Sequence, residues 1–135
     1  MTERSSGLLD TSVFIARETE RRLGELPHHV AVSVVTIGEL QLGVLCAADA
    51  RSRARRADTL ALARTADPIP ISEAIMVSWA RVVADCRSAG IHGMVKLTDA
   101  LIAATAVEHG LPIVTQDDNY DRIAAAHKHL RVIKV

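Results

Sequence analysis

Apolar residues follow two alternating patterns along the chain. Short apolar runs of strand length lie at residues 7–10, 30–33, 112–115 and 131–135, with a weaker run at 68–72. Between these runs, apolar residues recur at helical spacing over residues 13–23, 36–46, 51–66, 73–89, 99–109 and 119–127. Strands that alternate with helices predict an α/β fold with a central, mainly parallel sheet of four to five strands.

The predicted helix near residue 100 has the clearest ends. Thr98 is a suitable N-cap, Gly110 is a suitable C-cap, and Pro112 prevents the helix from continuing into the next strand. We therefore expect this helix to lie between Thr98 and Gly110, directly before the third strand.

Composition indicates one globular domain. The chain has 135 residues, of which 49% are apolar and 24% are charged, and it contains no internal repeat or linker, so residues 1–135 are expected to fold as a single unit. No run reaches the roughly 18 apolar residues of a membrane span, and Asp10 interrupts the segment that a signal peptide would need. We expect a cytoplasmic protein without a membrane partner.

Net charge excludes one common mode of nucleic-acid binding. Sixteen basic residues balance sixteen acidic ones, so no overall positive field draws the chain onto nucleic acid. The three aromatic residues, Phe14, Trp79 and Tyr120, are too few for a platform on which bases stack. Any contact with nucleic acid must therefore be local.

Four acidic residues stand out by their positions. Asp10 ends the first strand, Glu39 follows the second, Asp99 opens a helix, and Asp117 follows the third strand. Because ligands bind at the carboxyl ends of the strands in an open parallel sheet, these four side chains are expected to converge. Each acid alone has a simpler explanation as a helix cap, a dipole partner, a turn residue or a solvent-exposed side chain.

A cluster of carboxylates needs compensation for its charge. Two carboxylates ~5 Å apart repel by roughly 3 kcal/mol at an effective dielectric of ~20, so they share protons or bind a divalent cation. Ligands that are all oxygen suit Mg²⁺ or Mn²⁺. Such an ion polarises a phosphoryl oxygen and activates bound water, and phosphodiester hydrolysis is the chemistry that this pattern predicts.

Three segments resemble a known family. The stretches LLDTSVFI, SVVTIGELQLGV and KLTDALIAATAVEHGLPIVTQDDNYDRI are similar to the PIN-domain nucleases and, at this length, to the VapC-type toxins of bacterial toxin–antitoxin pairs. Asp10, Glu39, Asp99 and Asp117 fall on the four acidic positions of that family. The resemblance implies a three-layer α/β/α sandwich, metal-dependent endoribonuclease activity, a homodimer, and neutralisation by a cognate antitoxin.

The resemblance also implies roles for individual residues. Asp10, Asp99 and Asp117 would hold one or two Mg²⁺ ions, with Mn²⁺ possible, and Glu39 would be a ligand or would orient the attacking water. Water attack would leave 5′-phosphate and 3′-hydroxyl ends. Thr11, Ser12 and Thr115 would support the site through hydroxyl and backbone contacts. Tyr120 stands where the family usually has Phe. Asp118 and Asp121 lie near Asp117 and compete with it for the role of ligand.

Other features carry weaker predictions. The basic run contains Arg51, Arg53, Arg55 and Arg56, which would bind RNA or an antitoxin carboxylate, or would form a solvated helix face. His127 and His129 are expected to be exposed, because two histidines without a third ligand rarely hold a transition metal.

Two alternative functions stay open. A PIN-like fold could bind RNA or protein without catalysis. A magnesium-dependent phosphatase is the other, although Ser12 stands where a dehalogenase-type phosphatase would have its second aspartate.

Overall fold

A four-stranded parallel sheet forms the centre of the molecule. The computed structural model describes residues 5–135. Its strands are β1 (Ser6–Leu9), β2 (His29–Ala31), β3 (Ile113–Thr115) and β4 (Val132–Lys134), in the spatial order β2-β1-β3-β4. All neighbouring strands are parallel, and Leu8 pairs with Ala31 on one side and with Ile113 on the other. The predicted parallel sheet is confirmed with four strands. The weaker apolar run at residues 68–72 forms no strand and contributes only an isolated bridge between Ser33 and Ile69.

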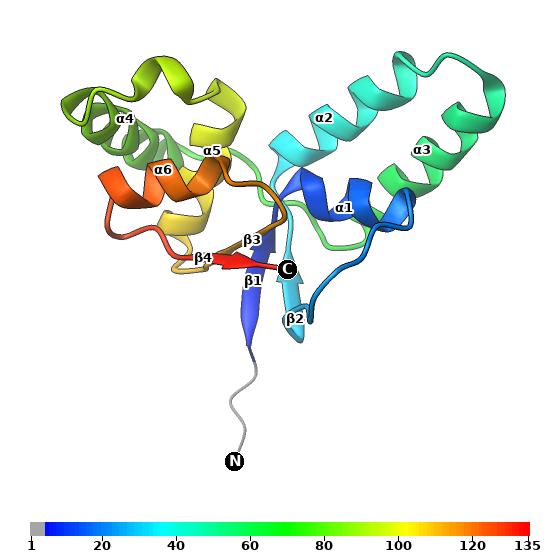
Figure 1. Ribbon diagram of the computed structural model, residues 1–135, viewed down its shortest axis with the longest axis horizontal. Coiled ribbons are helices and arrows are strands. Elements are labelled where there is room, and N and C mark those ends of the chain that lie inside the picture. Colours follow the sequence, from blue (N-terminus) through cyan, green and yellow to red (C-terminus); the bar gives the residue numbers. More distant parts are fainter. Residues whose placement is uncertain (1–4) are drawn as a thin grey trace.

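Within residues 5–135, six α-helices cover the two faces of the sheet (Figure 1). One group is α1 (Thr11–Glu18), α2 (Val34–Leu45) and α3 (Ala50–Arg64). The other group is α4 (Glu73–Ser88), α5 (Leu97–Glu108) and α6 (Asn119–Ala126), which lie to the left of the sheet in this view. A short 3₁₀-helix, η1 (His92–Met94), precedes α5.

The alternation of side chains along the central strands produces the two cores. Leu8 and Ile113 belong to a cluster with residues of α4, α5 and α6, whereas the adjacent Leu9 and Val114 belong to a cluster with residues of α1, α2 and α3. Because successive strand residues point to opposite faces, both faces of β1 and β3 are buried, which explains their continuously apolar sequences. The molecule is thus a three-layer α/β/α sandwich.

The first helix is shorter than its sequence pattern predicts. It ends at Glu18 rather than near residue 23, because Glu20 adopts a left-handed backbone with φ 57°. The amide of Arg21 then donates to the carbonyl of Ala16 at 2.7 Å, and the amide of Glu20 donates to that of Arg17 at 3.2 Å. This pattern is a Schellman-type end without the usual glycine, so no residue type at this position indicates that the helix ends there.

The predicted ends of the fifth helix are partly wrong. It begins at Leu97 with Lys96 as N-cap and without a capping side chain, so Thr98 lies in the first turn instead of capping it. Gly110 has φ 64° and occupies the left-handed position that follows a helix end, as expected.

Within residues 5–135, no helix combines the length and apolarity needed to cross a bilayer.

Candidate active site

Asp10 lies at the carboxyl end of the central strand β1 and also begins α1. It is only 3% exposed, and its Oδ2 accepts a hydrogen bond from the amide of Ser12 at 3.4 Å as the N-cap of α1. The side chain is therefore a helix cap, and this role fixes its carboxylate at the edge of the sheet.

Two further side chains hold the Asp10 carboxylate. The Thr115 hydroxyl, at the end of β3, donates to Oδ2 at 3.0 Å. The Tyr120 hydroxyl, from α6, donates to Oδ1 at 2.9 Å. Both oxygens of one buried carboxylate are thus fixed by neighbouring elements that are more than 100 residues away in the sequence.

The Tyr120 hydroxyl also connects Asp10 to Asp99. It lies 3.3 Å from Oδ1 of Asp99, which stands in the first turn of α5. Burial raises the pKa of the Tyr120 hydroxyl far above its usual range, and the charges of Asp10 and Asp99 raise it further. The hydroxyl therefore stays protonated and donates.

Glu39 reaches the site from α2, which lies in the helical layer opposite to the one that carries Asp99 and Tyr120. The Thr11 hydroxyl donates to Glu39 Oε1 at 2.6 Å and lies 3.1 Å from the Thr36 hydroxyl. Thr36 is fully buried and precedes Glu39 by three residues on α2. These contacts direct Glu39 towards the N-terminus of α1, where Asp10 lies.

The loop after β3 places Asp117. Its amide donates to the Thr115 hydroxyl at 3.0 Å, and the amide of Gln116 donates to the Ser12 hydroxyl at 3.0 Å. Ser12 and Thr115 hydroxyls are themselves 3.1 Å apart. The hydroxyls expected to support the site therefore tie the loop to the first turn of α1.

All four acids line one cavity of about 270 Å³. Two cationic residues that were not predicted to belong to the site, Arg21 and Lys96, share its wall. The complete lining is Asp10, Thr11, Ser12, Ile15, Arg21, Glu39, Lys96, Asp99, Asp117 and Asn119.

Asp118 and Asp121 point elsewhere. Both form ion pairs with the Lys134 ammonium, which lies 2.8 Å from Asp121 Oδ2. Neither residue lines the cavity. Of the three neighbouring acids, only Asp117 faces the other carboxylates.

Burial and mutual repulsion make the cavity unfavourable for negative charge. Burial raises the pKa of the Glu39, Asp99 and Asp117 carboxyls. Repulsion from Asp10 raises all three pKa values further, whereas the Lys96 ammonium lowers them. The site therefore favours a bound cation or protons.

The donors fit a hard divalent cation held mostly by water. They are all carboxylate oxygens, which suit Mg²⁺ or Mn²⁺. Within residues 5–135, no three acidic, histidine or cysteine side chains are arranged to hold an ion together. Mg²⁺ commonly binds through one or two carboxylates and keeps several waters, so this open arrangement suits it better than it suits an ion that needs a closed cage.

We expect the raised pKa values of these carboxyls to change how the free energy of unfolding depends on pH. Because their pKa values are raised on folding, the folded state binds more protons than the unfolded chain from about pH 4 up to those values. Their contribution to stability is present below this window and is lost as the pH rises through it. In urea unfolding with a chelator, the Glu39→Gln protein should lose less stability than the wild type as the pH rises above about pH 4.

A matched control separates this effect from charge removal in general. Glu25 is exposed and lies outside the cavity, so the Glu25→Gln protein should follow the wild-type curve. Identical curves for Glu39→Gln and wild type would contradict the argument.

The arginine run divides into two parts. Arg51, Arg53 and Arg55 are exposed on α3. The Arg56 guanidinium donates to the carbonyl of Gly43 at 2.6 Å and so joins α3 to α2. Arg56 also lines a cavity of about 300 Å³ that shares Ile15 and Glu39 with the acidic cavity.

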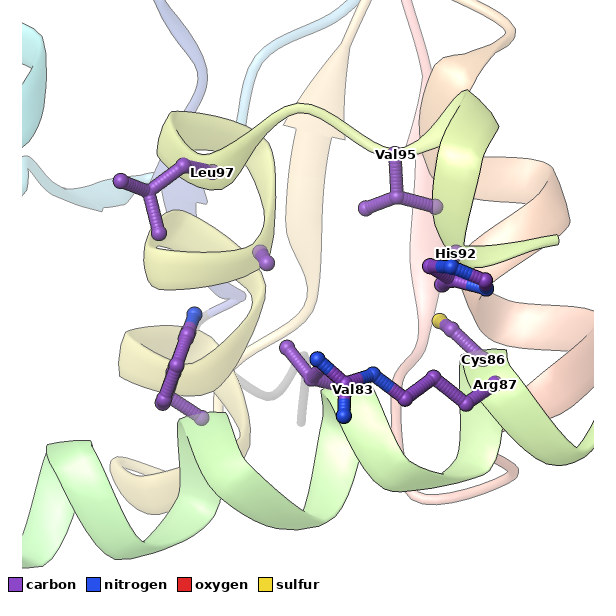
Figure 2. Close-up of a pocket in the computed structure, with 8 residues that line it drawn as sticks. Val83, Cys86, Arg87, His92, Val95 and Leu97 are labelled. Atoms are coloured by element: carbon purple, nitrogen blue, oxygen red, sulfur yellow. The ribbon is translucent and has the colours of Figure 1, made fainter.

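A separate cavity of about 180 Å³ lies between α4 and the segment that leads into α5. Figure 2 shows Val83, Cys86 and Arg87 on α4 facing Val95 on that segment and Leu97 at the start of α5. None of the four acids lines it, so this mainly apolar cavity is distinct from the candidate site.

The two C-terminal histidines differ from each other. His127 is only 5% exposed, and its Nδ1 lies 2.7 Å from Oδ2 of Asp85, so the expected exposure of His127 is wrong. His129 is exposed, with its ring centroid 5.5 Å from that of His127. The carboxylate partner of the buried His127 is exposed Asp85, which lies 42 residues away in the sequence, so no local pattern indicates that the histidine is buried.

Comparison with known proteins agrees with this geometry. The PIN domain family matches residues 7–126, which include all four acids and their supporting hydroxyls. The chain therefore belongs to the PIN-domain family, and the expected fold is confirmed.

Individual relatives narrow the class. The chain is 71% identical over 100 residues to ribonuclease VapC8 of Mycobacterium tuberculosis, covering 74% of this chain and 89% of that protein. It is 45% identical over 115 residues to ribonuclease VapC4 of the same organism, covering 84% and 87%. A crystal structure of VapBC-5 from M. tuberculosis, a member of the VapBC family of toxin–antitoxin systems, superposes with a TM-score of 0.87 and 36% identity over 97% of this chain and 99% of that one. Within the PIN family, the chain is of the VapC type.

Proposed function

We propose that this protein is an endoribonuclease toxin that hydrolyses RNA in the acidic cavity with the help of a divalent cation. The observation that carries the proposal is the meeting of Asp10, Glu39, Asp99 and Asp117 around one cavity at the carboxyl ends of the strands. Similarity to VapC ribonucleases supports RNA as the substrate class.

The acidic residues would bind the cation and the water. Asp10, Asp99 and Asp117 would hold Mg²⁺ or Mn²⁺ directly or through water. Bound there, the ion would polarise the scissile phosphate and lower the pKa of a coordinated water. Glu39, held by the Thr11 hydroxyl, is placed to orient the attacking water or to accept its proton.

The cationic residues of the cavity would receive the substrate. Arg21 and Lys96 both line it and offer positive charge to the phosphate of an RNA strand, which four carboxylates would otherwise repel. The exposed Arg51, Arg53 and Arg55 would bind RNA backbone or antitoxin carboxylates farther from the site.

We further propose that a cognate antitoxin neutralises the protein and that the protein acts as a cytoplasmic homodimer. The antitoxin proposal is supported by similarity to a chain of the VapBC-5 toxin–antitoxin structure.

RNA cleavage in vitro tests the proposal. The purified protein should cut RNA with Mg²⁺ or Mn²⁺ and should stop cutting when a chelator is in excess. Water attack predicts products with 5′-phosphate and 3′-hydroxyl ends, which ligation and end-labelling distinguish from 2′,3′-cyclic phosphates. RNA binding without cleavage would favour a catalytically silent module, and cleavage that persists in excess chelator would exclude the metal-dependent mechanism. Mapping the 5′ ends in cells that express the protein would identify the target RNA.

A further inference from the structure

Tyr120 combines a core position with a polar contact at the site. It is fully buried, and its ring belongs to the core cluster that contains Leu8, Ile102 and Ile123. Its hydroxyl nevertheless lies 2.9 Å from Asp10 Oδ1 and 3.3 Å from Asp99 Oδ1. Because core packing holds the ring, the position of the hydroxyl between the two carboxylates is fixed by the fold.

One phenolic proton is shared by two groups that repel each other. A tyrosine hydroxyl carries a single donor hydrogen, so the shorter contact to Asp10 and the longer one to Asp99 form a three-centre arrangement. Such a donor reduces the repulsion between the carboxylates and sets their relative orientation. Within residues 5–135, no other side chain donates a hydrogen bond to both.

The hydroxyl leaves both carboxylates able to bind an ion. Oδ2 of Asp10 is already engaged by Thr115 and by the amide of Ser12, whereas Oδ1 accepts only from Tyr120 in the described part of the chain. Each carboxylate oxygen has two lone pairs, so Oδ1 of Asp10 and both oxygens of Asp99 retain free acceptor sites.

We infer that Tyr120 is a positioning residue that holds Asp10 and Asp99 in the arrangement that binds the divalent cation. The inference rests on the proposed function and extends it to a residue outside the acidic set. Groups that hydrogen-bond metal ligands orient them, and their loss typically costs about 10- to 100-fold in metal affinity or activity.

The Tyr120→Phe protein tests the inference, because the change removes only the hydroxyl and keeps the ring in the core. Titration with Mn²⁺ alone, followed by electron paramagnetic resonance without RNA, should show metal affinity about 10-fold weaker than in the wild type. RNA cleavage should need correspondingly more Mg²⁺ but should approach the wild-type rate when Mg²⁺ saturates the enzyme.

The Thr105→Val protein is the matched control. Thr105 is also fully buried and lies on α5, and its hydroxyl donates to the carbonyl of Leu101 at 2.8 Å, away from the acids. The control should lower thermal stability without changing Mn²⁺ affinity, which separates positioning from a general packing effect.

The outcomes are distinguishable. If the wild type cleaves RNA with Mg²⁺ and Tyr120→Phe binds Mn²⁺ as tightly as the wild type or more tightly, the positioning role is wrong while the proposed function stands. A matched loss of affinity in both variants would also overturn the role. If the wild type shows no metal-dependent cleavage, the proposed function fails, and the inference fails with it.

Discussion

The Asp99→Asn protein is expected to cleave RNA about 10³-fold more slowly than the wild type while remaining folded. Loss of an interaction worth ~4 kcal/mol in the transition state gives this factor, which is within the range that a bound metal contributes. Asp99 is a better test than Asp10, because asparagine at position 99 can still accept the hydrogen bond from Tyr120 through its amide oxygen. Asparagine at position 10 would leave one of the donors around it without an acceptor.

The control for this experiment is Asp118→Asn. Asp118 is an exposed acid of the neighbouring loop that pairs with Lys134 and does not line the cavity. Single-turnover cleavage rates should fall for Asp99→Asn and stay near wild type for Asp118→Asn, with circular dichroism confirming that both fold. Wild-type rates in Asp99→Asn would show that the catalytic assignment is wrong.

The Ile102→Ala protein is expected to be less stable by about 2–5 kcal/mol, the usual cost of truncating a fully buried isoleucine. Ile102 is fully buried, three residues after Asp99 on α5, and it packs in the cluster that contains Leu8 and Ile113 of the central strands. The truncation would leave a cavity beneath the helix that carries Asp99.

Urea unfolding measures this change, and Leu42→Ala is its control. Leu42 is 61% exposed on α2, so truncating it should change the free energy of unfolding by about 0.5 kcal/mol or less. A loss below about 1 kcal/mol for Ile102→Ala would mean that the packing around α5 relaxes to fill the space.

The sequence predicted the elements that carry strong periodic signals. The two central strands were recognised because burial on both faces makes them continuously apolar, and the acids were recognised because each follows a strand or opens a helix. Convergence of the acids then followed from the parallel order of strands, which brings the carboxyl ends of β1 and β3 to the same edge.

Other parts of the site depend on geometry that single residues do not reveal. Arg21 reaches the cavity only because α1 ends at Glu18 and the chain turns at Glu20. Lys96 precedes α5 and has no local pattern that separates it from any other exposed lysine. The Tyr120 hydroxyl was visible only as a departure from the phenylalanine usual in the family, and its contact with two carboxylates needed the folded structure.

The three-layer arrangement makes the spacing of the site residues depend on both helical layers. Glu39 belongs to the layer of α1, α2 and α3, whereas Asp99 and Tyr120 belong to the layer of α4, α5 and α6, and the two layers are joined by the sheet and by a contact between α2 and α5. A small sliding of either layer along the strands would change the spacing between the groups that must act on one phosphate. Turnover should therefore be sensitive to mutations in both cores, including substitutions far from any charged residue.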